Sequence, residues 1–172
     1  MGMVPEGSTH PQGEALLEEL KWVHGIIREN LEAILQVAED ITNGAPAGEV
    51  QARLDDLAST SVIWRLRVDC MRYCYLVHAH HHGEDALFFP FLCAANPALR
   101  AVTDKLQADH IAVSDYLDKV QALSARIANE EQARGELAAA LRELSDHLLT
   151  HLDYEEENLA PTLRRLKEHP YR

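Results

Sequence analysis

The division of this chain into a few long segments with helical periodicity constrains its fold most strongly. The segments are rich in Leu, Ala, Glu and Arg, contain few β-branched residues and show no alternating apolar pattern, which favours helix over strand. The breaks between them are a polar stretch ending near Gly13, a loop signal over 42–48, the pair Asn96-Pro97 and a lapse in periodicity at 129–132. The pattern predicts helices over 14–41, 49–93, 98–128 and 132–168.

The second segment is too long for one helix of a bundle. The small polar residues 59–61 predict an interruption, with a fresh helix capped there and starting near Val62. Short connections favour antiparallel neighbours, so we predict an all-α fold, an up-down-up-down antiparallel four-helix bundle over 14–168. Residues 1–13 are predicted to form a flexible leader and residues 169–172 a tail.

Composition narrows the class of protein. The 172 residues carry 16 Lys+Arg against 28 Asp+Glu, a formal net charge of -12, which argues against a nucleic-acid or anionic-membrane partner. Three cysteines cannot build a disulfide framework. No apolar run reaches the roughly 18 residues that span a bilayer, and the first residues do not resemble a signal peptide. We therefore expect a soluble cytoplasmic domain.

Polar residues interrupt the apolar stripe of every predicted helix. The first stripe contains His24, the second His80 with Glu84 one turn later, the third His110, and the fourth His151 with Glu155 one turn later. A carboxylate on a leucine face is unfavourable unless a cation or strong hydrogen-bond donors meet it. In an antiparallel bundle these residues fall at similar heights along the core, so they can form one layer.

An internal repeat supports the same interpretation. The second helix carries His80-x3-Glu84-Asp85-x4-Pro90, and the fourth carries His151-x3-Glu155-Glu156-x4-Pro161. A single histidine on an apolar face is more often a core residue, and His-x3-Glu alone is a routine helical pair. Six such residues in one layer, arranged in two similar halves, predict a site for a pair of metal ions with Glu84 and Glu155 positioned to bridge them.

Four further residues are predicted either to join the ligands or to surround them: His81, His147, Tyr73 and Glu156. His81 flanks the stripe by about 100°, and a local shift would recruit it. His147 precedes His151 by one turn. Tyr73 is nearly eclipsed with His80 but is better explained as a core residue.

The series His24, His80-x3-Glu84, His110 and His151-x3-Glu155 resembles the H–HxxxE–H–HxxxE pattern of the hemerythrin-like HHE cation-binding family. The segments HHHGEDALFFPFL and HLDYEEENLAPTL are similar to the family's second and fourth helices. The resemblance implies an oxygen-bridged, non-haem di-iron centre in which Glu84 and Glu155 bridge the irons and the four histidines are terminal ligands.

One departure bears on function. Oxygen-carrying hemerythrins have His-x3-His on the third helix, whereas Ser114 stands four residues after His110. The fifth nitrogen ligand is therefore missing, and its position is left to His147, water, a carboxylate or Tyr73. Manganese and zinc are alternatives to iron for such ligands. A ferritin-like site is excluded because no histidine has a glutamate three residues before it.

Two functions follow from these expectations. The first is a di-iron protein that binds or senses O2 or reactive oxygen and nitrogen species. The alternative is a di-iron oxidoreductase of oxidative or nitrosative stress defence, acting by peroxide disproportionation or iron oxidation. The expected small ligands are O2, peroxide or nitric oxide, and no motif identifies an electron donor. A third interpretation is an acidic bundle whose histidines hold zinc or no metal.

Overall fold

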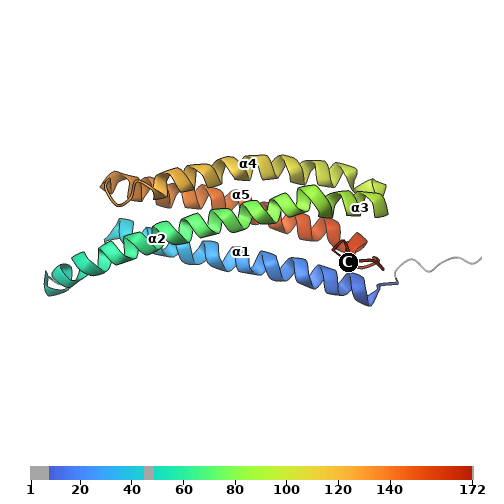
Figure 1. The fold of residues 1–172 in the computed structure, drawn as a ribbon, viewed down its shortest axis with the longest axis horizontal. Helices are drawn as coiled ribbons and strands as arrows, with labels where there is room; N and C mark the ends of the chain where they lie inside the picture. The colour runs from blue at the N-terminus through green and yellow to red at the C-terminus, as the bar shows by residue number, and fades with distance from the viewer. Residues whose placement is uncertain (1–7, 45–48, 172) are drawn as a thin grey trace, which may run out of the picture.

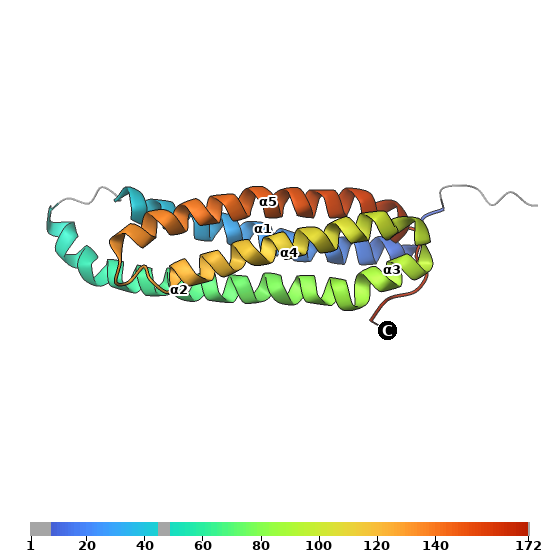
Figure 2. The same cartoon turned by 90° about the horizontal axis from the view of Figure 1, so that it is seen from above.

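Four long helices form an antiparallel bundle in the computed structural model, which describes residues 8–44 and 49–171, with only the backbone of residues 49–61. They are α1 (Pro11–Asn43), α2 (Glu49–Gly83), α4 (Arg100–Ser124) and α5 (Glu131–Leu163). α1 and α4 each pack beside both α2 and α5, so the helices surround one core (Figures 1 and 2). The predicted all-α, up-down-up-down architecture is confirmed.

The helix ends differ from the prediction by a few residues. α1 begins at Pro11, inside the predicted leader, because the ring of His10 accepts a hydrogen bond from the backbone N–H of Gln12 and a proline suits the first turn. α5 ends at Leu163 rather than at 168. Residues 1–7 lie outside the described residues, so the flexible leader remains a prediction for them.

The predicted interruption at 59–61 is wrong, because α2 is continuous from Glu49 to Gly83. Serine and threonine each cost a helix only a few tenths of a kcal/mol relative to better helix formers. Residues 59–61 include no Gly or Pro, and the helix continues through them.

The same segment instead changes geometry further along. A π-helical turn, η1 (Glu84–Phe88), follows α2 and leads into α3 (Phe89–Ala95), then a 3-10 turn, η2 (Pro97–Leu99). The N–H of Phe89 donates to the carbonyl of Glu84, five residues back. Pro90 has no N–H, and in a regular helix its ring would clash with a carbonyl four residues back. The wider turn removes that clash at the point where the predicted site residues lie.

The core consists of two apolar clusters along the bundle axis. One, nearer the α4–α5 connection, includes Leu31, Leu117 and Leu141, and the other, nearer α3, includes Leu17, Phe89 and Leu163. On each helix the predicted site residues stand between members of the two clusters. The fold therefore places a polar layer between two apolar ones. None of the helices in the described part of the chain is long and apolar enough to cross a membrane.

Candidate metal centre

One side of the polar layer is formed by His24 of α1 and His80 of α2, here called the His24–His80 pair. Their Nε2 atoms are 3.1 Å apart. The Oε1 atom of Glu84 lies 2.9 Å from the Nε2 of His80 and 3.8 Å from that of His24. The Oε2 atom of Glu155 lies 3.6 Å from the Nε2 of His24. Two imidazoles and two carboxylates thus converge on this side.

The other side contains three imidazoles, here called the His81–His110–His151 group. The Nε2 atoms of His110 and His151 are 3.1 Å apart. The ring of His81 stacks on that of His110 with centroids 3.8 Å apart and meets the ring of His151 edge-on. One ligand atom from each of these three residues and from Glu84 lies within 4.8 Å of the others.

Both carboxylates reach both sides of the layer. Glu84 directs Oε1 to the His24–His80 pair and Oε2 to His110, whose Nε2 is 3.3 Å away. The Oε2 atom of Glu155 is 3.6 Å from the Nε2 atoms of His24 and His151. The structure therefore brings all six predicted ligands together and adds His81 to them. Each carboxylate lies within 3.6 Å of an imidazole nitrogen on either side of the layer.

The hydrogen bonding of the cluster is incomplete without a cation. Among the described residues, both carboxylate oxygens of Glu84 and Glu155 and the Nε2 of His81 are buried without a hydrogen-bond partner. The imidazole nitrogens of His80 and His110 lie 2.9 and 3.3 Å from the oxygens of Glu84, but the angles are not those of hydrogen bonds. Unpartnered buried carboxylates are costly. A set of imidazole nitrogens and carboxylate oxygens fits iron, manganese or zinc.

An outer ring of carboxylates orients the imidazoles. The Nδ1 of His24 is 2.8 Å from Glu156, and the Nδ1 of His110 is 2.8 Å from Asp85. A longer contact of 3.5 Å joins the Nδ1 of His151 to Asp109. Each carboxylate accepts the Nδ1–H and leaves Nε2 as the nitrogen facing the centre, the arrangement in which histidine binds metals.

The electrostatics keep the outer carboxylate of Glu156 ionised. Burial alone would raise the pKa of Glu156, but hydrogen bonds from His24 and Arg28 lower it to about 2. The guanidinium of Arg28 donates to Glu156 and to Asp153, both at 2.8 Å. His24 is therefore held by a charged network that reaches the surface.

Within the layer, burial determines the charge states. Burial and the nearby charge of Glu84 raise the pKa of Glu155 well above its usual range. Burial lowers the pKa of His81 to about 2 and that of His151 to about 4, and His110 acts in the same direction on both. Both imidazoles are therefore neutral at pH 7, which is the form that binds metals.

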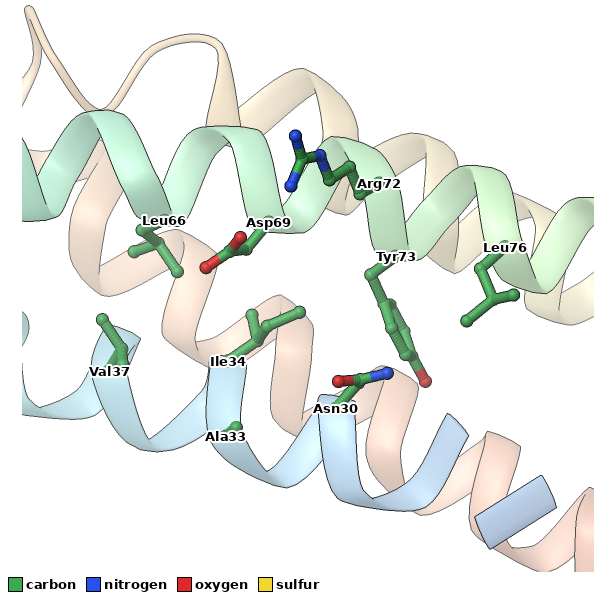
Figure 3. A pocket seen from close by; sticks show the side chains of 9 residues that line it. All are labelled: Asn30, Ala33, Ile34, Val37, Leu66, Asp69, Arg72, Tyr73 and Leu76. Carbon is green, nitrogen blue, oxygen red and sulfur yellow. The ribbon is translucent and has the colours of Figure 1, made fainter. Parts of the chain in front are cut away.

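Three of the four additional candidates lie outside the layer. His147 is hydrogen-bonded to Tyr116 at 2.8 Å on the outer side of α5. Glu156 contacts the far side of His24 rather than the centre. Tyr73 is buried two turns before His80 and donates to the carbonyl of Ile27. Figure 3 shows Tyr73 lining a separate cavity of about 370 Å³ between α1 and α2.

His81 is the residue that periodicity alone placed least well. Pro90 does not locate it, because a proline at the same spacing in the other half of the repeat lies inside a continuous α-helix. The equivalent Pro161 of α5 follows His151 by the same interval.

The comparisons with known proteins identify the family. The sequence model of the family described as hemerythrin HHE cation binding domain matches residues 63–163, more than half of the chain. This chain belongs to the hemerythrin HHE cation-binding family. No curated protein and no solved structure matched it. The matched region carries every residue of the layer except His24, which α1 supplies.

Membership and geometry agree on the kind of site. The family is one of cation-binding domains, and this hemerythrin-like bundle holds a buried cluster of histidines and glutamates that could bind a metal. Five imidazoles and two carboxylates, divided between two sides, offer enough ligands for two ions rather than one.

Proposed function

We propose that the protein binds two iron ions in the polar layer and uses them to bind or sense O2 or reactive oxygen and nitrogen species. The observation that carries this proposal is the pair of glutamates that each reach both imidazole groups. Such a division suits two adjacent ions with shared carboxylates. Manganese and zinc accept similar ligands and are the competing metals.

Each residue of the layer then has a distinct role. Glu84 and Glu155 would bridge, the His24–His80 pair would bind one ion, and the His81–His110–His151 group would bind the other. Two iron ions held here would exchange electrons with O2 or peroxide. The apolar clusters above and below the layer exclude bulk water, and the outer carboxylates hold the imidazoles in the binding tautomer.

The two sides differ in the pockets that reach them: a pocket of about 310 Å³ with a mainly polar lining reaches Asp109 and His151 on one side. A pocket of about 100 Å³ reaches His80 and Glu84 and is otherwise lined mainly by apolar side chains. A pocket of this size has room for a ligand of a few atoms. This size fits O2, nitric oxide or hydrogen peroxide, and the side with two imidazoles has the fewer ligands. We therefore place small-molecule binding at the His24–His80 pair.

Metal analysis after expression in iron-supplemented medium tests the proposal. We expect two irons per chain and the near-ultraviolet charge-transfer bands of a bridged diferric centre. His80→Ala should lower the iron content, whereas Glu157→Gln, an exposed neighbour of the site on α5, should not. A colourless protein that binds zinc or no metal would overturn the proposal. Reversible bleaching with O2 removal would indicate a carrier or sensor, and sustained O2 evolution from peroxide would indicate an enzyme.

A further inference from the structure

The pocket beside the His24–His80 pair is lined in part by a residue from the segment that follows α5. The pocket reaches His80 and Glu84, and its other lining residues come from α1, η1 and the segment after α5: Leu16, Glu19, Leu20, Val23, Phe88 and Tyr171. Leu16, Leu20 and Phe88 are buried, whereas Tyr171 is 54% exposed. Part of the tyrosine side chain therefore borders the pocket while the rest meets water.

Tyr171 is held in this position by a short network. The Nε2 of His169 lies 3.4 Å from the Oε2 of Glu19 on α1. The backbone N–H of Tyr171 donates to the Nδ1 of His169 at 3.2 Å, and the two rings meet with centroids 5.6 Å apart. His169 thus links the segment to the same carboxylate that lines the pocket.

The start of the segment is fixed as well. The N–H of His10 donates to the carbonyl of Arg164 at 2.7 Å. A Cβ atom at Gly13 would collide with the backbone carbonyls of Leu163 and Arg164, so only glycine allows α1 and the end of α5 to approach this closely. The segment after α5 therefore leaves the bundle beside α1 and turns across the pocket.

We propose that Tyr171 and Glu19 select the exogenous ligand of the metal centre by size and by charge. The proposal rests on the proposed function. The aromatic ring limits the pocket to molecules of a few atoms. The carboxylate of Glu19 at the rim, with Glu84 at the inner end, disfavours anions relative to neutral molecules. Burial, Glu84 and Glu19 raise the pKa of Tyr171, so its phenol adds no negative charge of its own.

A first test needs no iron. Diethyl pyrocarbonate modifies accessible imidazoles, and mass spectrometry of peptides follows each histidine separately. In metal-free protein we expect Tyr171→Ala to accelerate modification of His80 by about tenfold, a typical size for a steric restriction, while Tyr171→Phe leaves it unchanged. Exposed His82 is the internal standard, and fully buried His24 must stay unmodified, which verifies the fold. Equal rates at His80 in all three proteins would overturn the role of Tyr171.

A second test compares two peroxides on the diferrous protein. Each accepts two electrons and two protons, ROOH + 2 e⁻ + 2 H⁺ → ROH + H₂O, with the electrons supplied by the two ferrous ions. We expect Tyr171→Ala to raise the ratio of the rate with tert-butyl hydroperoxide to that with hydrogen peroxide by about tenfold. Tyr75→Ala, which removes an exposed tyrosine of α2 outside the pocket, should not change the ratio. An unchanged ratio in Tyr171→Ala would contradict size selection.

The charge component is tested with azide, an anion of three atoms. We expect Glu19→Gln to tighten azide binding to the diferric protein several-fold, as removal of one nearby surface charge would, with little change in the rate with neutral hydrogen peroxide. Equal azide affinity in both proteins would refute charge selection. If the wild-type protein binds iron but does not react with hydrogen peroxide or azide, the proposed function fails and this proposal with it.

Discussion

The two sides of the polar layer share one repeated sequence pattern and yet differ at two pairs of positions. His81, which follows His80, adds a third imidazole to one side, whereas the equivalent residue after His151 is Leu152, a member of the apolar core. Asp109, which precedes His110, contacts the ring of His151. The equivalent residue before His24 is Val23, which lines the pocket beside His80.

These differences give the two sides different surroundings, since a mainly polar pocket reaches His151 and a mainly apolar one reaches His80. The His81–His110–His151 group has three imidazoles, two of them contacted by outer carboxylates. The His24–His80 pair has two imidazoles and an adjacent pocket. In the proposed function, the repeat would supply a symmetric scaffold for two ions, and these differences would direct ligand binding to one of them. Each prediction below tests this comparison.

The largest expected effect comes from Glu84→Gln, because the two oxygens of Glu84 face opposite sides. We expect both ions to be lost, with a reduction in iron affinity beyond the 10- to 100-fold typical of outer residues. Iron per chain, measured after competition with a chelator, checks this. Glu157→Gln is the matched control, and circular dichroism of the metal-free variant should show unchanged helicity. Retention of one full iron by Glu84→Gln would show that Glu84 serves one side alone.

Removal of His81 is expected to weaken the side with three imidazoles selectively. We expect His81→Phe, which keeps a ring to stack on His110, to lower the affinity for one of the two irons by at least about tenfold, a loss of about 1.4 kcal/mol. His82→Ala, an exposed neighbour, is the control. Stepwise iron titration separates the two sites. If His81→Phe binds both irons as the wild type does, His81 is a packing residue and the sides are equivalent in ligand number.

The outer carboxylates allow one side to be weakened at a time. Asp85→Asn should affect His110, and Glu156→Gln should affect His24, since each accepts the Nδ1–H of that imidazole. We expect about a tenfold loss of iron affinity in each case, at the lower end for such residues. Azide binding distinguishes them: Glu156→Gln should weaken it and Asp85→Asn should not. Equal loss of azide binding in both variants would contradict placement of the open position at His24–His80.

Periodicity predicted much of this arrangement, and the limits of that prediction have physical causes. The stripes located His24, His110 and the two His-x3-Glu pairs because a regular helix repeats every 3.6 residues. His81 was expected beside the layer rather than in it, because it lies about 100° around α2 from His80. Residues 59–61 were expected to interrupt α2 because Ser and Thr favour helix caps. In the folded protein the helix continues through them.

The pocket cover lay beyond periodic reasoning altogether. Tyr171 follows the last helix, and its position depends on contacts of His169 and Gly13 with distant parts of the chain. Such contacts between sequence ends leave no pattern within a window of a few turns. The difference between Val23 and Asp109 is visible in the sequence. Its effect on the two sides could not be predicted, because the sequence does not show which imidazole each residue lies beside.

The pH dependence of stability in the metal-free protein tests the charge states within the layer. Burial lowers the pKa of His151 to about 4 and that of His81 to about 2. Below pH 6.5, the ordinary pKa of histidine, the unfolded chain takes up protons on both residues while the folded protein does not, so stability falls as pH falls. Glu155 cancels the effect of one of these two protons above pH 4.5. In that range its raised pKa keeps it protonated in the folded protein, whereas it is ionised in the unfolded chain. The net expectation is a loss of about 1.4 kcal/mol per pH unit from 6.5 to 4.5.

Above pH 6.5 the sign reverses. Burial acts to lower the pKa of His24, but Glu156 and Glu84 outweigh it and raise that pKa. The stabilisation from His24 and from Glu155 is complete below their unfolded pKa values and is lost as pH rises through the folded ones. Urea unfolding at pH 5, 6.5 and 8 should therefore show maximal stability near 6.5, and Glu155→Gln should flatten the decline at pH 8. A steady rise from pH 5 to 8 would contradict these charge states. In the iron-loaded protein, stability is expected to rise steadily from pH 5 to 8, because metal binding displaces the same protons. The difference in slope between the stability curves of the iron-loaded and metal-free proteins gives the number of protons displaced.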